Sequence, residues 1–386
     1  MMKAKHFLIL ILTAFLAACS IDISDNPTPT PPAIGDNTGV ESPTTASQPT
    51  TQEGTTPEAA GPTTEETSPT EASATLPPPA WAEMGLTGSF YYNAFINEQQ
   101  NLLRLDLETG EQVTLYDPPE NAWLADVAVS PNGRQIAMAY GPPPDEGQVQ
   151  FGFTDLYTMP ADGSAEPVPL LTRKETSETF YNVSWPLDDY LYYAHFVPTT
   201  DDLGSVVYYS QVERFHIPSG ESEVLVERAA WPRLSEDGTK MAYVTDNNDF
   251  VVSNADGSNP LVIDLSTNRF PAVDAPLFSP DGNTLYFSAI EPEVQPLLSF
   301  WDRLMGVKVA SAHSVPSDWW RISADGSGEP EQLTNIFEIG MYGDFGPDGN
   351  YIGFITASGV QVMNPDGTGV VRLKNIPTTG TMNWVP

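Results

Sequence analysis

A short turn that leads into a strand recurs along the chain, and this recurrence restricts the fold more than any other feature. Its clearest copy is FSPDGNTLYFSA, which begins at Phe278. The same pattern appears in VSPNGRQIAMAY, LSEDGTKMAYVT and FGPDGNYIGFIT, which begin at Val129, Leu234 and Phe345. Proline presets φ at the second turn position, Asp or Asn suits the third, and Gly supplies the positive φ at which the chain reverses. These stretches are therefore predicted to be tight turns between strands.

A second glycine turn alternates with the first. It occurs at Gly163, Gly220, Gly257, Gly326 and Gly367. One more copy, at Gly110, has no first-type turn before it, and the missing strand matches the C-terminal residues Thr381–Pro386. If each unit has strands a to d, the first turn lies at a–b and the second at c–d.

Counting the turns gives five complete units, one of them with the degenerate turn Trp185–Asp189, and one unit shared between the two ends of the chain. A shared unit is how a β-propeller closes its ring without an open seam. The predicted fold class is therefore all-β, a six-bladed β-propeller with a split closing blade. An unrelated β-sandwich with similar turns is the alternative.

The residues around the turns resemble a known family. An apolar residue, S-P-D-G, an alternating strand and D-G-S follow one another, and the unit ends in Leu-Thr at Leu171–Thr172 and Leu333–Thr334. This order resembles the WD-like propeller repeats of TolB-like proteins over nearly the whole segment 80–386. The resemblance implies the fold but no single function, because such propellers serve many tasks. TolB itself has an N-terminal α/β domain, which is replaced here by a linker.

The N-terminus is predicted to be a bacterial lipoprotein signal. Lys3 and Lys5 precede a short apolar run at Phe7–Phe15, and a run this short indicates a secretory signal peptide rather than a membrane span. The sequence LAAC that ends at Cys19 resembles a lipobox, and no other cysteine is present. We therefore predict lipidation of Cys19, which anchors the protein in the cell envelope on the outer face of a membrane. An ordinary signal peptide with an incidental cysteine is the alternative.

Three regions follow from the composition. The signal peptide occupies residues 1–18, and a tether rich in Thr, Pro, Ser and Glu occupies residues 19–79. The tether contains no aromatic residue, and such a segment cannot bury enough apolar surface to offset its ordering entropy, so we predict that it is disordered. The propeller occupies residues 80–386, where every Trp and Tyr is found.

The charge of the chain excludes one class of partner. The sequence has 16 Lys and Arg against 51 Asp and Glu, a formal net charge of -35. Such a surface repels the phosphate backbone, so nucleic acid is not expected as a partner. We expect a monomer that meets the membrane through its N-terminal lipid only.

Uneven spacing between strands b and c indicates where a partner binds. Extra residues occur at 141–151, 197–207 and 290–317. In a propeller the b–c loops open on the face opposite the a–b turns, and variable loops on a rigid scaffold commonly carry binding. The longest insert has apolar residues at helical spacing, which predict either a lid helix on the propeller mouth or a docking helix for a protein partner. These residues are Leu297, Leu298, Trp301, Leu304 and Met305.

Polar residues on strand a are candidates for binding at the channel mouth, which we expect on the same insert-bearing face. They are Asp126, Asn182, Arg233, Asp344 and Asn383. Converging carboxylates could hold a cation such as calcium or position a ligand, and solvated channel walls are the alternative. No other cofactor and no other metal site is expected.

Catalytic motifs are missing from the sequence. There is no G-x-S-x-G elbow and no H-E-x-x-H, and the histidines beyond the signal peptide, His195, His216 and His313, are widely spaced. We therefore expect a TolB-like binding or scaffolding lipoprotein that is not an enzyme, with a protein or peptide partner on the insert-bearing face. The alternative is a propeller hydrolase or lyase that acts on cell-surface glycans through paired carboxylates.

Overall fold

The computed structural model describes residues 79–145, 152–200, 204–265, 270–290, 313 and 315–386. Their only helix is a short 3-10 turn, η1 (Ala82–Met84). None of the described helical residues forms a helix long and apolar enough to cross a membrane. The signal peptide with Cys19, the tether up to residue 78 and the insert helix expected at 297–305 lie outside the described residues, so those assignments stay predictions.

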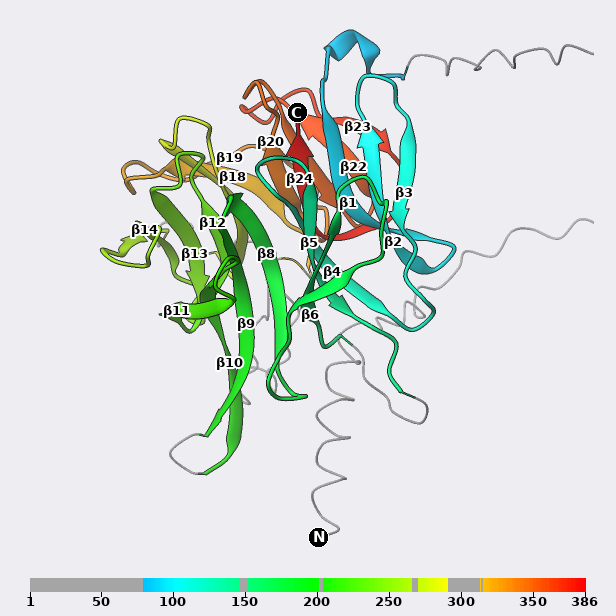
Figure 1. Ribbon diagram of the computed structural model, residues 1–386. Coiled ribbons are helices and arrows are strands. Elements are labelled where there is room, and N and C mark those ends of the chain that lie inside the picture. The colour runs from blue at the N-terminus through cyan, green and yellow to red at the C-terminus, as the bar shows by residue number, and fades with distance from the viewer. Residues whose placement is uncertain (1–78, 146–151, 201–203, 266–269, 291–312, 314) are drawn as a thin grey trace, which may run out of the picture. The chain divides into compact units, whose positions relative to one another are not determined.

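The strands form six four-stranded antiparallel sheets, which stand as blades in a ring (Figure 1). Blade 1 contains β24 (Thr378–Val385), β1 (Ser89–Ile96), β2 (Gln99–Asp106) and β3 (Gln112–Tyr116). Blade 2 contains β4 (Trp123–Val129), β5 (Gln135–Gly141), β6 (Asp155–Pro160) and β7 (Val168–Leu171). Blade 3 contains β8 (Thr179–Leu187), β9 (Tyr190–Thr200), β10 (Val206–His216) and β11 (Glu221–Glu227).

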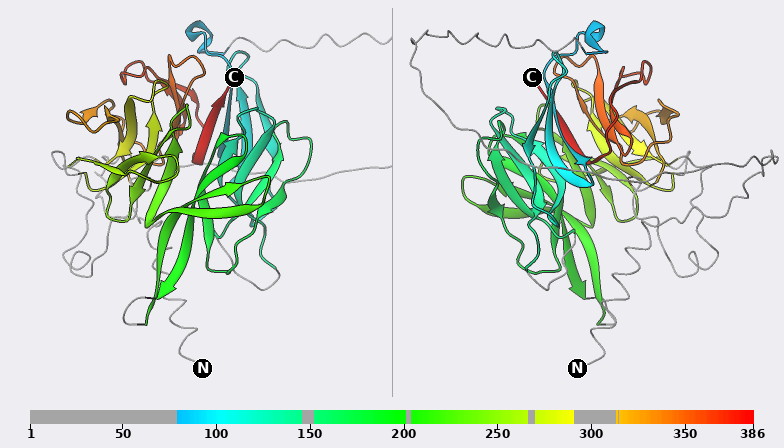
Figure 2. Two further views of the ribbon diagram at one scale, coloured as in Figure 1. Left: turned by 60° about the vertical axis from the view of Figure 1, so that its left-hand side comes forward. Right: turned by 90° about the vertical axis from the view of Figure 1, so that its right-hand side faces the viewer.

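The remaining blades repeat the same order of strands. Figure 2 shows the blades of the ring from two further sides. Blade 4 contains β12 (Ala229–Leu234), β13 (Lys240–Thr245), β14 (Phe250–Asn254) and β15 (Leu261–Ile263). Blade 5 contains β16 (Val273–Phe278), β17 (Thr284–Ala289), β18 (Asp318–Ser323) and β19 (Glu331–Gln332). Blade 6 contains β20 (Tyr342–Phe345), β21 (Ile352–Thr356), β22 (Gly359–Met363) and β23 (Val371–Lys374).

Blade 1 confirms the predicted closure, because its first strand comes from the C-terminus and its other three from the N-terminal end of the propeller. β24 pairs antiparallel with β1, from Ser89 opposite Val385 to Ala94 opposite Thr378. Trp384 packs edge-on against Phe90 with ring centroids 4.7 Å apart, and its indole nitrogen donates to the carbonyl of Thr87 at 2.8 Å. The six-bladed all-β fold with a split blade is thus confirmed.

The a–b turns explain why the S-P-D-G motif recurs. Asp281 Oδ1 accepts hydrogen bonds from Ser279 Oγ at 2.6 Å and from the backbone nitrogen of Asn283 at 3.0 Å. Gly282 has φ +68° and donates its N–H to Ser279 at 2.8 Å. Asn132 accepts from Arg134 N at 3.0 Å in the equivalent turn. The Asp of the repeat is therefore a turn residue, and an amide oxygen can replace its carboxylate.

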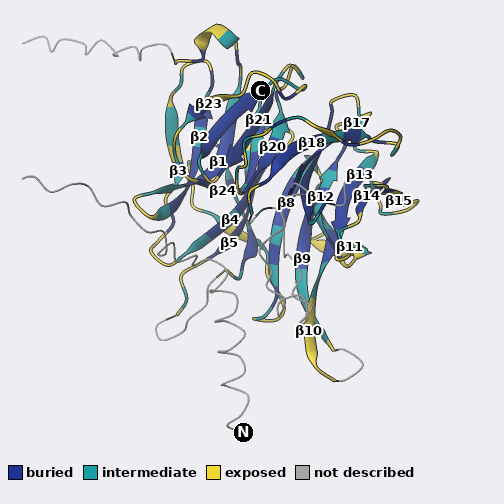
Figure 3. Cartoon of the chain, turned by 180° about the vertical axis from the view of Figure 1, so that it is seen from behind, coloured by how far each residue is buried: buried dark blue, intermediate teal, exposed yellow. Residues whose placement is uncertain are grey.

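One insert differs from the expectation. The segment 197–207 was predicted to be a loop, but β9 and β10 continue as a paired hairpin from Val197 opposite Tyr209 to Thr200 opposite Val206. Its β-branched and aromatic residues favour strand, and Phe196 stacks on Tyr208 with ring centroids 5.1 Å apart. The hairpin extends beyond the other blades and is exposed at its end, whereas the strands of the ring are mostly buried (Figure 3).

Candidate functional site

The five polar residues predicted at the channel mouth separate into two groups. Asp126 and Asn182 are 4% and 7% exposed and hold neighbouring inner strands together. Asp126 Oδ2 accepts the backbone N–H of Asn182 at 2.6 Å, and Asn182 Oδ1 accepts that of Trp231 at 3.3 Å. Burial raises the pKa of Asp126 to about 6. Both residues are therefore part of the channel wall.

Arg233, Asp344 and Asn383 do meet at one place. Arg233 forms an ion pair with Asp344 Oδ1 and donates to the Tyr342 hydroxyl at 2.7 Å. Burial alone would lower the pKa of Arg233, but Tyr342 and Asp344 raise it above its usual value, so the guanidinium stays charged. This contact joins β12 of blade 4 to β20 of blade 6, past the innermost strand of blade 5.

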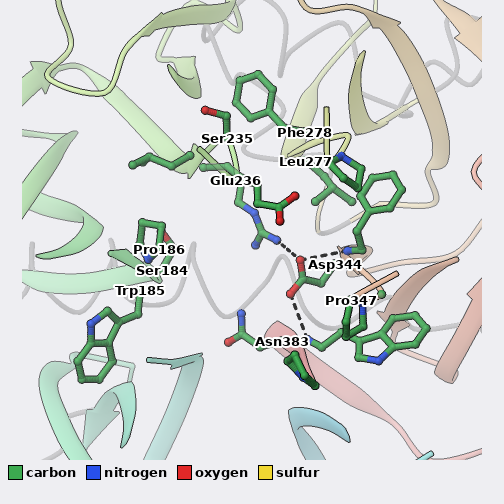
Figure 4. A pocket seen from close by; sticks show the side chains of 17 residues that line it. Ser184, Trp185, Pro186, Ser235, Glu236, Leu277, Phe278, Asp344, Pro347 and Asn383 are labelled. Carbon is green, nitrogen blue, oxygen red and sulfur yellow. Dashed lines mark hydrogen bonds and ion pairs between the residues drawn. The ribbon is translucent and has the colours of Figure 1, made fainter. Parts of the chain in front are cut away.

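These three residues lie in a hollow of about 310 Å³, which we call the channel-mouth pocket. Figure 4 shows Glu236 and Asn383 pointing into the same space as Asp344. The pocket is lined by the ends of β8, β12, β16, β20 and β24 and by the turns that follow them. We call the face that carries these a–b and c–d turns the turn face, and the opposite one the insert face.

The position of the pocket corrects the sequence expectation about the face. Arg233 and Asp344 are the next-to-last residues of β12 and β20, and Asn383 lies near the end of β24. The sequence pattern predicts them at the start of strand a, on the insert face. Because strand a ends at the a–b turn, the structure places all three on the turn face.

Sequence reasoning missed the apolar wall of the pocket. In three successive blades an aromatic residue stands two positions before a proline: Phe278 before Pro280, Phe345 before Pro347 and Trp384 before Pro386. All six residues line the pocket, together with Trp185 and Pro186 of blade 3. The recurring aromatic-x-Pro pattern is the sequence signal for this wall. It was missed because proline also suits the turn geometry by itself.

Farther along the channel, aromatic rings of blades 4 and 6 lie together with the ring of His313. The Trp231 and His313 rings lie 5.1 Å apart, and Trp231 lies 6.3 Å from the Tyr342 ring. The His313 carbonyl accepts the N–H of Gly340 at 3.0 Å. Burial lowers the pKa of His313 to about 4, more than the bond to the Met341 backbone raises it, so the imidazole is neutral at pH 7.

A second polar cluster lies in blade 3 toward the insert face. His195 Nδ1 is 2.7 Å from Glu213 Oε1, and the Tyr193 hydroxyl donates to Glu213 Oε2 at 2.7 Å. Burial raises the pKa of Glu213, but hydrogen bonds from His195 and Tyr193 outweigh it and lower this pKa below its usual value. Both carboxylate oxygens of Glu213 thus have partners within blade 3.

The described residues give no support to the cation alternative. They contain no group of three or more His, Cys, Asp or Glu side chains that could hold a metal ion. Asp344 already pairs with Arg233, and its Oδ2 accepts the backbone N–H of Trp384 at 3.0 Å.

Solved structures with this arrangement include proteins of different kinds. TolB from Acinetobacter baumannii is 13% identical over 78% of this chain and 68% of its own, with a TM-score of 0.49. An oligogalacturonate lyase in complex with manganese is 16% identical over 74% and 73%, with a TM-score of 0.46. A chain of the nidogen/laminin complex is 10% identical over 76% and 97%, with a TM-score of 0.50.

In fold, the body is a six-bladed β-propeller. At these identities the likeness concerns the fold alone. No family model and no curated protein matches the sequence.

Proposed function

We propose that the protein is a binding or scaffolding lipoprotein whose channel-mouth pocket takes up an extended peptide segment of a partner protein. The lining of the pocket carries this proposal: aromatic and proline side chains surround a floor of hydrogen-bonding groups. Extended segments are commonly bound in grooves lined by aromatic residues, where a few polar groups fix their direction. The proposed site is thus on the turn face rather than on the insert face that the sequence favoured.

The size of the pocket sets the scale of the ligand. A hollow of about 310 Å³ is at the small end of ligand pockets, so it suits one or two apolar side chains. Asn383 uses its Oδ1 to accept the N–H of Val129 at 2.9 Å, which leaves its Nδ2 facing the pocket as a donor. A peptide backbone offers the carbonyl oxygens that such a donor needs.

Binding is favoured over catalysis because one of the two carboxylates in the pocket is already held by other groups of the protein. Glycoside cleavage needs two carboxyl groups that can donate or accept a proton or attack the sugar. Glu236 and Asp344 share the pocket, but Asp344 is held by Arg233 and by the N–H groups of Phe345 at 3.1 Å and Trp384 at 3.0 Å. Only Glu236 is then available for such chemistry.

The proposal is tested with a randomised dodecapeptide library displayed on phage and selected on the whole protein. The account expects selected peptides with apolar anchors, and Trp185→Ala is expected to weaken their binding about tenfold because one wall of the pocket is lost. Tyr208→Ala is the control, since it removes an aromatic residue that is 41% exposed on the blade 3 hairpin. Equal losses in both variants, or binding sensitive only to Tyr208→Ala, would refute the pocket as the site.

We also propose that the protein is anchored through Cys19. The basis is the lipobox-like LAAC sequence, in which the cysteine is the only one of the chain. Cys19→Ser is expected to move the protein from the membrane to the soluble fraction after cell fractionation. Membrane association that persists in this variant would contradict the anchor.

A further inference from the structure

Arginines are few in this acidic chain, and most of those described have a carboxylate partner. Salt bridges hold six of the eight arginines in the described ranges: Arg173, Arg214, Arg228, Arg233, Arg321 and Arg372. Arg104 and Arg134 are the two without a salt bridge in this part of the chain. Because the chain carries 51 acidic residues, two arginines without a carboxylate partner are unexpected.

Both of these arginines line the same hollow of about 310 Å³, which we call the arginine hollow. Arg104 comes from β2 of blade 1, and Arg134 follows the a–b turn of blade 2. Tyr91 of β1, directly opposite Arg104 in the ladder, forms another part of the wall. Two arginines from neighbouring blades thus line one hollow.

The nearest carboxylates are engaged by their own turns. Asp106 Oδ1 accepts two bonds from Thr109, both at 2.7 Å, and Asp162 Oδ1 accepts the N–H of Ser164 at 2.9 Å. Arg104 helps to lower the pKa of Asp162, after the larger effect of the hydrogen bonds from Ser164, so this acid is near but not paired. Asp162 itself lines the hollow but forms no salt bridge with either arginine, so both arginines can still bind a carboxylate from outside.

The arginine hollow lies beside the channel-mouth pocket on the turn face. A Cβ added to Gly133, which lines the hollow, would stand 3.7 Å from Val385 Cγ1. The next residue, Pro386, lines the channel-mouth pocket. A peptide that leaves the pocket over Pro386 would therefore meet Arg104 and Arg134 next.

We propose that the arginine hollow binds an acidic side chain of the peptide whose apolar anchor occupies the channel-mouth pocket. This inference rests on the proposed function and names the class of partner, an extended segment with an acidic residue beside its anchor. Guanidinium groups suit a carboxylate because their N–H donors match its two oxygens in one plane. The negative charge of the protein opposes acidic peptides in general, so only a local test isolates the contribution of the two arginines.

The test compares peptides selected on the whole wild-type protein with copies in which Glu or Asp is replaced by Gln or Asn. For the wild type, this replacement is expected to lower affinity about five- to tenfold, which is typical of two partly exposed charge-assisted contacts. In the double variant R104Q/R134Q the two peptide forms are expected to bind equally. Lys174→Gln is the control, because it removes an exposed positive charge between blades 2 and 3, outside both hollows.

The outcomes separate this inference from the proposed function. If peptides bind and Trp185→Ala weakens them, but acidic residues are not enriched or the replacement affects wild type and double variant alike, the arginine hollow is refuted alone. If no peptide is retained, the proposed function fails, and this inference fails with it. Retention of uronate oligosaccharides instead, dependent on Arg104 and Arg134, would overturn the peptide class in favour of an acidic glycan.

Discussion

The two ends of the propeller channel are built in opposite ways. Toward the insert face, where strand spacing varies most, the rings of Trp231 and His313 pack against each other with centroids 5.1 Å apart. At the turn face, where the turns are regular, a hollow remains above the Arg233–Asp344 pair. The described residues also form a hollow of about 330 Å³ at the b–c turn of blade 4, lined by Asn248 and Asp249, so hollows occur on both faces. At the turn face the convergence of strand ends around the axis makes the hollow.

The largest loss of stability is expected for a change in the split blade, which closes the ring and forms part of the turn-face pocket. Trp384 is 6% exposed, lines the pocket and packs on Phe90 in the split blade. Trp384→Ala is expected to lower the free energy of unfolding by about 3–5 kcal/mol, as for other buried aromatic residues. Chemical denaturation measures this, with Tyr208→Ala on the hairpin expected to cost only about 0.5–1.5 kcal/mol, because the residue is 41% exposed but stacks on Phe196. Similar losses in the two variants would mean that the split blade does not hold the ring.

The burial of the His313 ring can be tested through the pH dependence of the free energy of unfolding. The pKa of His313 is about 4 in the folded state, below its ordinary value of 6.5. The unfolded chain therefore takes up a proton first, and the contribution of His313 to the free energy of unfolding is expected to fall by about 3 kcal/mol as the pH drops from roughly 6.5 to 4. His313→Gln should remove this loss, which is measured as the change in the stability difference between the two proteins. If the stability difference between wild type and His313→Gln stayed constant over this pH range, the His313 imidazole would be solvated and not buried.

Asp126 in the channel wall is expected to have the opposite pH dependence: its burial lowers the free energy of unfolding at high pH, not at low pH. Asp126 has a folded pKa of about 6, above its ordinary value of 3.8, so its burial favours folding at low pH and opposes it once the carboxyl ionises. Asp126→Asn is expected to raise stability at pH 7 by about 2–3 kcal/mol, with no gain below roughly pH 4. Thermal unfolding at both pH values measures this change. A variant less stable at pH 7 would show that the bond to the Asn182 backbone needs the charge.

The smallest effect is expected from a matched pair of prolines. Pro347 and Pro131 occupy the same position of two a–b turns, but only Pro347 lines the channel-mouth pocket. Either proline changed to Ala should cost about 0.4–1 kcal/mol, because the unfolded chain gains freedom. Only Pro347→Ala is expected to weaken peptide binding, by a few-fold. Equal peptide binding by both variants would show that Pro347 does not contribute to recognition of the peptide.

Much of the fold could be predicted from the sequence because its determinants are local. The S-P-D-G turns need only proline, an Asx side chain and a glycine at positive φ. The split blade followed from the turn at Gly110, which has no first-type turn before it, and from the matching strand at Thr381–Pro386. The hairpin at 197–207 was missed because its alternating residues were assigned to an insert. The pocket was missed because it depends on contacts far apart in the chain, such as Arg233 with Asp344, which no short pattern records. The lipidation of Cys19 and the insert helix at 297–305 stay predictions.

The central claim, that the turn face is the binding face, is tested most directly by hydrogen–deuterium exchange of the whole protein with and without a selected peptide. The account predicts slower exchange on binding in the turns at 233–238, 278–283 and 344–349 and at the end of β24. Protection confined to the β9–β10 hairpin and the b–c inserts, with no change in these turns, would contradict it.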